Sequence, residues 1–418
     1  MKIGFSTPTR RRAVAVLVFA LAAVYLLLTA REFVASGLGS RAQLSSLTRA
    51  AQLDPGNADY RNRLGRYYDL VARDPSAAIE QHRAAVALNP HSARFWFDLA
   101  SAYQVLGDTA GQTAALEHAI QADSMTPDVA WEAANLYLVE GDNEKALREF
   151  RVVMANDTSL AGNAIQFCWR IEPDVDALLR DVVPPSDDAY VTFLSLLEDK
   201  QETAGTFKVW QALIESHQPF ELGFVYGYVR FLVLHKQVDQ AVAVWQQAAG
   251  RFGLSAYLPS ANNLIVNSTF NLNILDGGFD WQYQKQSGVT LTLDPSEHHA
   301  GRRSLLITFD GPRISDAGFY QLVAVQPSTT YEFSAFYKAG EREGAGGPHL
   351  TIQDVYSQAF YYDSDDLEEA GFWKSVGGEF TTSPDCKLVM LHVRRIPEGS
   401  PIRGKLWIDD FHLARKPS

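Results

Sequence analysis

Apolar side chains recur three and four positions apart between residues 40 and 258, and this spacing predicts amphipathic helices. Trp96, Leu99, Ala100 and Tyr103 would share one face of such a helix. A helical hairpin with a single apolar side cannot bury that side alone. We therefore expect neighbouring hairpins to stack on one another.

The helical pattern repeats along the chain. Tyr68, Tyr103 and Tyr137 stand 35 and 34 residues apart, and the triplet Val-Trp-Gln occurs at 209–211 and again at 244–246. A period of this length is typical of an α-solenoid, with unrelated amphipathic helices as the alternative interpretation. The sequence thus predicts about five helical hairpins over residues 40–258.

The middle copy of the repeat has the most complete motif. It matches W-x2-L-G-x2-Y with Ala100 in place of the glycine, and Gly107 follows at the turn between helices. The third copy matches the later part of the pattern, A-x3-F, through Ala146 and Phe150. Period and motif resemble the tetratricopeptide repeat (TPR). That resemblance implies a solenoid with a groove for a protein or peptide.

An uncharged apolar segment runs from Ala13 to Ala30, after Lys2 and the three arginines 10–12. As a helix it would be roughly 27 Å long, close to the roughly 30 Å hydrocarbon core of a bilayer. The basic residues before it favour a cytoplasmic N-terminus and export of the rest of the chain. We expect residues 1–39 to form a basic stub and a single-pass transmembrane signal anchor. A cleaved signal peptide ending near residues 35–37 is the alternative.

From about residue 260 the pattern changes to an alternation of apolar and polar residues, which predicts β-strands. Such runs occur at 304–309, 331–337 and 387–393, with Gly, Pro, Ser and Asp between them. No helical segment separates them that could connect parallel strands. Residues 260–418 should form an antiparallel β-sandwich, joined to the helical part near Pro259. The expected fold class is multidomain α and β.

Several short motifs are spread over this C-terminal region, at 263–270, 277–281, 301–305, 320–334 and 406–413. Taken in order, they resemble the jelly-roll carbohydrate-binding modules and their galactose-binding-like relatives. The resemblance implies a jelly roll over residues 260–418 and carbohydrate binding as one of its functions. Many domains of this shape bind proteins instead, so fold and function are separate expectations.

Sugar recognition uses aromatic rings that stack on pyranose faces and planar polar side chains that bridge neighbouring hydroxyls. The candidate glycan-binding residues are Trp281, Tyr320, Gln321, Tyr361, Tyr362 and Trp373. Aromatic residues with a polar edge are also common in sandwich cores. Core packing is therefore the alternative for each of these rings, and the favoured one for Trp281.

Modules of this kind often carry a structural calcium ion near the chain ends. The resemblance implies that Asn271 would supply one ligand and Asp409 or Asp410 another. An asparagine brings no charge, so such a calcium site would be weak. A second oxygen-rich segment, residues 363–369, reads more simply as a solvated loop.

The composition sets further limits on function. A net charge of −12 over 418 residues offers no basic stripe to nucleic acid or to an anionic membrane surface. The two cysteines, Cys168 and Cys386, lie in different predicted domains, and no His/Cys cluster has zinc spacing. No hydrolase, P-loop or dinucleotide motif occurs, so we expect no enzyme.

These features together lead to one hypothesis. The chain would be a scaffold anchored in a bacterial inner membrane, with its bulk in the periplasm. It would couple protein partners in the TPR groove to a polysaccharide at the C-terminal domain, in exopolysaccharide assembly or export. The alternative is a purely protein-binding envelope scaffold whose sandwich binds no sugar.

Overall fold

The computed structural model describes residues 8–217, 219–311, 313–396 and 399–417. The predicted basic residue Lys2 lies outside the described residues. The chain divides into two compact units, residues 1–196 and residues 197–418, and each is described by itself. The division falls within helix α11 (Asp187–Asp199), so the last helices belong to the same unit as the strands.

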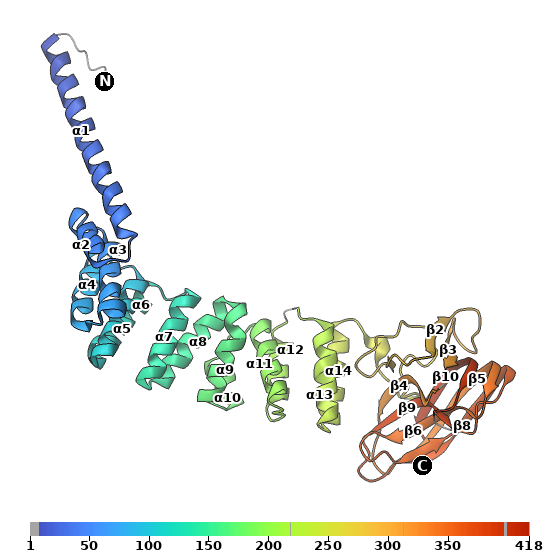
Figure 1. Cartoon of the computed structure of the whole chain (residues 1–418). Coiled ribbons are helices and arrows are strands. Elements are labelled where there is room, and N and C mark those ends of the chain that lie inside the picture. The colour runs from blue at the N-terminus through green and yellow to red at the C-terminus, as the bar shows by residue number, and fades with distance from the viewer. Residues whose placement is uncertain (1–7, 218, 312, 397–398, 418) are drawn as a thin grey trace. The chain divides into compact units, whose positions relative to one another are not determined.

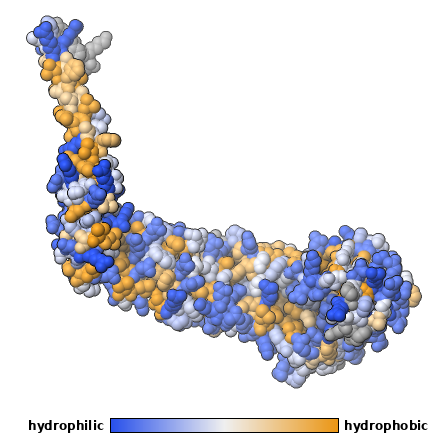
Figure 2. Space-filling model, in the orientation of Figure 1, coloured by the Kyte–Doolittle hydropathy of each residue, from blue (hydrophilic) through white to orange (hydrophobic). Residues whose placement is uncertain are grey.

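Helix α1 (Pro8–Gly39) contains the whole apolar segment 13–30. Within the described ranges it is the one helix long and apolar enough to cross a membrane, and a signal sequence would have the same character. Figure 2 shows its surface as a hydrophobic band. Its last turn packs on the repeats, where the Arg63 guanidinium donates to the carbonyl of Gly39 (3.3 Å).

Helices continue from α2 to α14 (Figure 1). Their bounds are α2 (Leu44–Leu53), α3 (Ala58–Tyr67), α4 (Pro75–Leu88), α5 (Ala93–Leu106), α6 (Thr109–Ala122), α7 (Pro127–Glu140), α8 (Asn143–Asn156), α9 (Thr158–Ile171), α10 (Val175–Asp181), α11 as given above, α12 (Thr206–Glu215), α13 (Leu222–Leu234) and α14 (Val238–Arg251). A π-helical turn, Tyr68–Ala72, extends α3, and a short 3₁₀ turn, Ser255–Tyr257, follows α14.

The turns inside the first three hairpins repeat the same capping chemistry. Gly107 and Gly141 end α5 and α7 in the left-handed conformation, with φ of 80° and 82°, which glycine adopts without strain. The next helix begins two residues after each glycine, α6 at Thr109 and α8 at Asn143. Asp74, Asp108 and Asp142, each 34 residues from the next, accept a hydrogen bond from a first-turn backbone N–H of α4, α6 and α8.

The predicted apolar face of the repeats is confirmed. Leu99, Ala100 and Tyr103 are buried in α5, and Tyr137 is buried at the equivalent place in α7. Trp96 is half-buried and stacks on His118 of the next helix, with 4.5 Å between ring centroids. The later triplets also share a role, because their tryptophans are buried in α12 and α14. The helical region is therefore TPR-like, as predicted.

Within the described residues the strands form two five-stranded antiparallel sheets, so the predicted β-sandwich is confirmed. The first sheet has the order β1-β4-β9-β6-β7 and the second β2-β3-β10-β5-β8. The bounds are β1 (Gln282–Tyr283), β2 (Val289–Asp294), β3 (Ser304–Gly311), β4 (Asp316–Ala324), β5 (Thr330–Gly344), β6 (Gly347–Asp354), β7 (Phe360–Asp363), β8 (Ala370–Thr381), β9 (Leu388–Ile396) and β10 (Ile402–Arg415).

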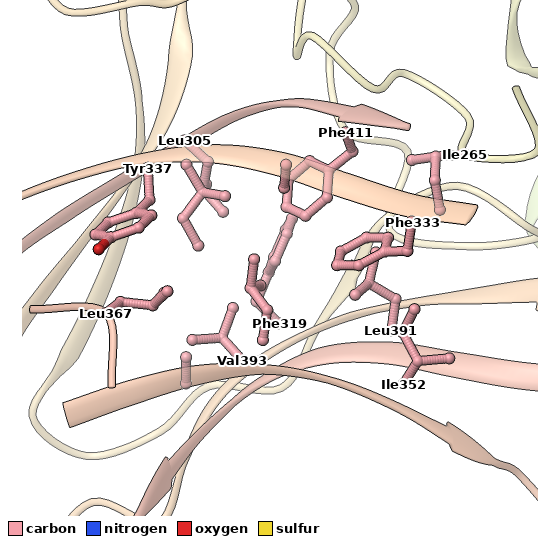
Figure 3. Close-up of a cluster of buried hydrophobic side chains, with 14 of the residues drawn as sticks. Ile265, Leu305, Phe319, Phe333, Tyr337, Ile352, Leu367, Leu391, Val393 and Phe411 are labelled. Carbon is pink, nitrogen blue, oxygen red and sulfur yellow. The ribbon is translucent and has the colours of Figure 1, made fainter. Parts of the chain in front are cut away.

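The sandwich core lies between the two sheets, where alternate residues of each strand point inward. Figure 3 shows Phe319, Leu391 and Val393 from the first sheet facing Phe333 and Phe411 from the second. Burying aromatic side chains of this size removes much apolar surface from water, which is the main source of stability for such a domain. Side chains at the intervening positions of the first sheet point to its outer face.

Candidate functional site

The outer face of the first sheet forms one side of a groove of about 720 Å³, and helix α13 forms the other. Both elements belong to the compact unit 197–418. The sheet contributes residues from β1, β4 and β9, and the segment before β1 contributes the turn 276–278. The lining side chains include Tyr226, Arg230, Val233, Asp276, Gln282, Gln284, Gln286, Asp316, Tyr320, Leu322, Met390 and His392.

Two adjacent glycines let the last helices approach the sandwich. A Cβ atom on Gly277 would lie 2.5 Å from the ring of Tyr226, and one on Gly278 would lie 2.5 Å from the ring of Trp245. Gly278 also has a φ of 61°, which disfavours other residues. An ion pair between Lys387 and Asp239 spans the same contact. The groove is thus held in place by direct packing of helices on sheet.

A row of polar side chains crosses the outer face of the sheet. Gln282, Tyr320 and His392 are register partners on the neighbouring strands β1, β4 and β9. The Tyr320 hydroxyl donates to Gln282 Oε1 (3.0 Å), and His392 Nδ1 lies 3.1 Å from Asp316 Oδ2. Burial raises the pKa of Tyr320, so its hydroxyl stays protonated and able to donate.

One nitrogen in this row has no hydrogen-bond partner in the part of the chain that the structure describes. His392 is 6% exposed, and its Nε2 atom is buried without a hydrogen-bond partner among the described residues. A buried polar atom that makes no hydrogen bond is costly, and most such atoms in native proteins find a partner. Because His392 lines the groove, a ligand there could supply the missing hydrogen bond.

A glycine brings further amides to the same groove. Gly318 has a φ of 70°, and a Cβ atom there would lie 2.1 Å from the carbonyl oxygen of Gln284. The segment after β1 therefore runs close to β4, and the Gln284 N–H donates to the Gly318 carbonyl (2.6 Å). Gln282, Gln284 and Gln286 alternate along this segment and all line the groove. Amide groups and a phenol beside apolar Leu322 suit a ligand with many hydroxyl groups.

The predicted glycan-binding residues do not form one site. Trp281 is 1% exposed and packs in the core, where its ring stacks on Phe319 with 4.7 Å between centroids. Gln321 is fully buried and bonds to the backbone of Val266 in both directions (2.9 and 3.0 Å). Neither side chain is accessible to a ligand. The glycan role is therefore wrong for Gln321, because alternation alone does not tell which side of its strand faces the interior. For Trp281 the favoured interpretation, core packing, is confirmed and the glycan role is wrong.

The other predicted aromatic residues lie away from the groove. Tyr361 and Tyr362 are in β7, at the opposite edge of the first sheet from β1, and both pack partly against the core. The Tyr361 hydroxyl is 3.0 Å from Ser383 Oγ and also accepts from the Ser383 N–H. Trp373 lies in β8, at the edge of the second sheet, with its ring edge-on to His299. Only Tyr320 lines the groove.

Sequence reasoning missed Asp316, His392 and every residue of α13 that lines the groove. The alternation of Gln282, Gln284 and Gln286 was a usable signal, since it places three amides on one side of an extended segment. No local signal marked His392, because its partner Asp316 is 76 residues away in the sequence. The sequence pattern of α13 predicted only a helix of the repeats and gave no sign that it lines a groove.

The predicted calcium ligands meet N–H groups instead of a cation position. Asp409 is fully buried, and its carboxylate accepts hydrogen bonds of 2.8 Å from the backbone N–H groups of His299, Ala300 and Asp410. Asn271 Oδ1 accepts from the Arg302 N–H (2.8 Å), and Asp410 Oδ2 lies 3.1 Å from His299 Nδ1. These oxygens already accept N–H groups, whose positive ends oppose a cation beside them, so this donor set does not suit calcium.

The repeats carry a separate polar network on α3, α4 and α5. His82 is fully buried, with Nδ1 2.8 Å from Asn62 Oδ1 and Nε2 2.9 Å from Asp69 Oδ2. Asn62 in turn donates to Asp98 Oδ2 (2.6 Å). Arg66 lies 3.9 Å from the other oxygen of Asp98. The network links two consecutive repeats, and its outer members carry charge at the surface.

Comparison with known proteins agrees with the sandwich fold. Residues 262–396 match the family model described as a carbohydrate binding domain, CBM_4_9. The match covers the segment from the start of the sandwich to the end of β9, and so includes Gln282, Asp316, Tyr320 and His392. No curated protein matches the chain significantly.

Similar solved structures fall into two groups. Among those that resemble the sandwich is a structure described as "CBM4 structure and function". It has 17% identity and a TM-score of 0.28, and the match covers 36% of this chain and 99% of that chain. Another is the CBM22-1 xylan-binding domain of Xyn10C from Paenibacillus barcinonensis, with 14% identity, 38% and 98% covered, and a TM-score of 0.26. The second group includes the crystal structure of MamA protein. It has 18% identity and a TM-score of 0.27, and the match covers 46% of this chain and 91% of that chain.

At these identities and TM-scores the solved structures carry no argument about a ligand or partner of this chain. The family match and the two antiparallel sheets stand independently of them. Residues 262–396 thus resemble a carbohydrate-binding domain in sequence and form a β-sandwich, and a helical region of TPR-like repeats precedes them in the chain.

Proposed function

We propose that the chain is a membrane-anchored, exported scaffold whose C-terminal domain binds a glycan in the groove between α13 and the first sheet. The match of residues 262–396 to a carbohydrate-binding domain carries this proposal. The row of Gln282, Tyr320 and His392 supports it, since amide, phenol and imidazole groups all hydrogen-bond to hydroxyls. A groove of about 720 Å³ is within the range of known ligand sites.

The anchor and the compartment rest on the N-terminal helix. α1 is apolar and exposed over residues 13–30, and arginines 10–12 precede this segment. Positive residues on the N-terminal side favour a cytoplasmic N-terminus. In this proposal α1 stays in a bacterial inner membrane, and the repeats and the sandwich lie in the periplasm.

The repeats are the proposed site for a protein partner. Stacked helical hairpins present an extended surface of the kind that solenoid proteins use for binding. A chain that holds a protein on its repeats and a polysaccharide on its sandwich would bring the two together at the membrane. We propose exopolysaccharide assembly or export as the process that uses such a scaffold.

A purely protein-binding scaffold is the second candidate. The burial of Trp281 and Gln321 favours it, because two of the six candidate glycan-binding residues are inaccessible. The two proposals differ in one observable property, which is retention by a polysaccharide.

Native affinity electrophoresis of the full chain in mild detergent tests the proposed function. Soluble xylan, mixed-linkage β-glucan, galactan, polygalacturonate and alginate would each be cast into a gel. The proposed function predicts that at least one polymer retards the chain, and that Tyr320→Ala reduces the retardation. Phe372→Ala, which removes a ring that is 68% exposed on the other sheet, is the matched control and should be retarded like the wild type. No retardation by any polymer would favour the protein-binding scaffold.

A further inference from the structure

We infer that helix α13 is a wall of the glycan site itself, so that an uncharged polysaccharide segment lies between this helix and the outer face of the first sheet. The inference rests on the proposed function and adds to it. It assigns ligand contacts to the helical region and a charge class to the ligand. Three independent features of the groove carry it.

The first feature is the pair of glycines on the groove side of α13. Gly223 and Gly227 are one helical turn apart, and both line the groove. Glycine is disfavoured in a helix interior, so a packing requirement usually explains its presence there. Here a Cβ atom would meet nothing within 4 Å at either position. The glycines are therefore not needed for packing, and their effect is to keep open the space beside the sheet.

The second feature is the unpartnered nitrogen across that space. His392 lines the groove from the sheet side, and its Nε2 atom is buried and has no partner among the described residues. The gap left by the glycines and the missing hydrogen bond belong to the same groove. A hydroxyl-bearing ligand between helix and sheet would fill the gap and supply the missing hydrogen bond.

The third feature is the balance of charge. Arg230 of α13 lines the groove and makes no ion pair with any residue that the structure describes. Asp276 and Asp316 also line it, and each already accepts a backbone hydrogen bond, from Tyr283 N–H (3.0 Å) and Gly318 N–H (2.6 Å). One cation beside two carboxylates gives no net positive charge to attract an acidic polymer. An uncharged ligand, with hydroxyls that accept from Arg230 and donate to the carboxylates, suits this set.

The test places a side chain in the gap. Gly227→Leu would fill the space beside the sheet, and Arg230→Ala would remove the helix's donor. Gly250→Leu in α14 is the matched control, since a Cβ atom there also meets nothing within 4 Å and the residue does not line the groove. Retardation of each full-length variant would be measured in the xylan, β-glucan, galactan, polygalacturonate and alginate gels, and its melting temperature recorded.

The expected result is that a neutral polymer retards the wild type, that Gly227→Leu lowers the apparent affinity at least tenfold, and that Gly250→Leu does not. Arg230→Ala should also weaken retention. The melting temperature of Gly227→Leu should not fall, because leucine favours the helix more than glycine does.

Four other outcomes would overturn the inference. Wild-type retention by a neutral polymer that Gly227→Leu leaves unchanged would remove α13 from the site, while the proposed function stood. Equal loss in Gly250→Leu would show that the effect does not come from the groove. Stronger retention by polygalacturonate or alginate than by every neutral polymer would refute the assigned ligand class. If no polymer retards the wild type, the proposed function fails together with the inference.

Discussion

The Tyr356 hydroxyl donates a hydrogen bond of 2.8 Å to the main-chain carbonyl of Val233. Tyr356 lies in the turn between β6 and β7, and Val233 lies in the last turn of α13. The Lys236 ammonium sits 5.5 Å from the centre of the same tyrosine ring. The Val233 carbonyl also accepts the backbone N–H of Lys236 (3.0 Å), so Tyr356 adds a second hydrogen bond at the end of the helix. It therefore fastens the end of α13 to the sandwich.

Tyr356→Phe should weaken this attachment while keeping the ring for Lys236. Loss of one hydrogen bond is expected to lower the free energy of unfolding by about 0.5–1.5 kcal/mol. Urea unfolding of the full chain, followed by fluorescence, would measure it. Tyr283→Phe, at a ring that is 50% exposed, is the control and should change stability by less. Equal stability of Tyr356→Phe and wild type would show that the bond contributes nothing to docking.

Asp280 makes stability depend on pH in an unusual direction. Burial raises the pKa of its carboxyl from the usual 3.8 to about 6, although hydrogen bonds from the Leu275 and Trp281 N–H groups oppose the rise. A raised folded-state pKa means that the folded protein holds this proton more tightly than the unfolded chain. The stabilisation is complete below about pH 3.8 and is lost as the pH rises through 6.

Asp280→Asn should remove this dependence. The difference in unfolding free energy between the variant and the wild type is expected to grow in favour of the variant between pH 4 and pH 7. A shift of about two pKa units corresponds to roughly 3 kcal/mol as an upper value. Urea unfolding of the variant and the wild type at pH 4 and at pH 7 measures this difference. The contributions of other titrating groups cancel, because both proteins contain them. Asp294→Asn is the opposite-sign control, because hydrogen bonds from Ser296 lower the pKa of Asp294.

Gly65 tests the packing between the two helices of the first repeat. A Cβ atom there would lie 2.6–2.8 Å from three atoms of the His82 ring, which Asn62 and Asp69 hold in place. Gly65→Ala should destabilise the repeats by about 1–3 kcal/mol through overpacking. Gly162→Ala in α9, where the nearest atom is 4.0 Å away, should stabilise by about 0.5–1 kcal/mol instead. Thermal unfolding of the two variants would reveal whether their effects have opposite signs.

Metal removal should leave the sandwich unchanged. Both carboxylate oxygens of Asp409 already accept backbone N–H groups, so we expect no calcium ion to be required at this place. The melting temperature should be the same in excess EDTA and in millimolar calcium. A saturable rise with calcium, absent in Asp410→Asn, would contradict the reading of this site. The same measurement in millimolar magnesium would distinguish a specific calcium site from a general effect of ionic strength.

Much of the architecture could be predicted because it follows from local patterns. The 34-residue spacing of Asp74, Asp108 and Asp142 repeats a cap that each hairpin forms within its own sequence. Alternation predicted the strands, since side chains on a strand point to opposite faces in turn. The candidate site was less predictable. Alternation says that Tyr320 and Gln321 face opposite ways, but not that Tyr320 faces the groove and Gln321 the interior.

The sequence by itself determined the repeated hairpins, the apolar first helix and the strands of the C-terminal domain, because periodicity and capping act over a few neighbouring residues. The tertiary structure alone decided where the groove lies. Gln282, Tyr320 and His392 come together only through the register of three strands. Gly277 and Gly278 leave the room in which Tyr226 of α13 and Trp245 of α14 pack beside them. Contacts between residues so far apart in sequence depend on how whole elements pack, which no local pattern specifies.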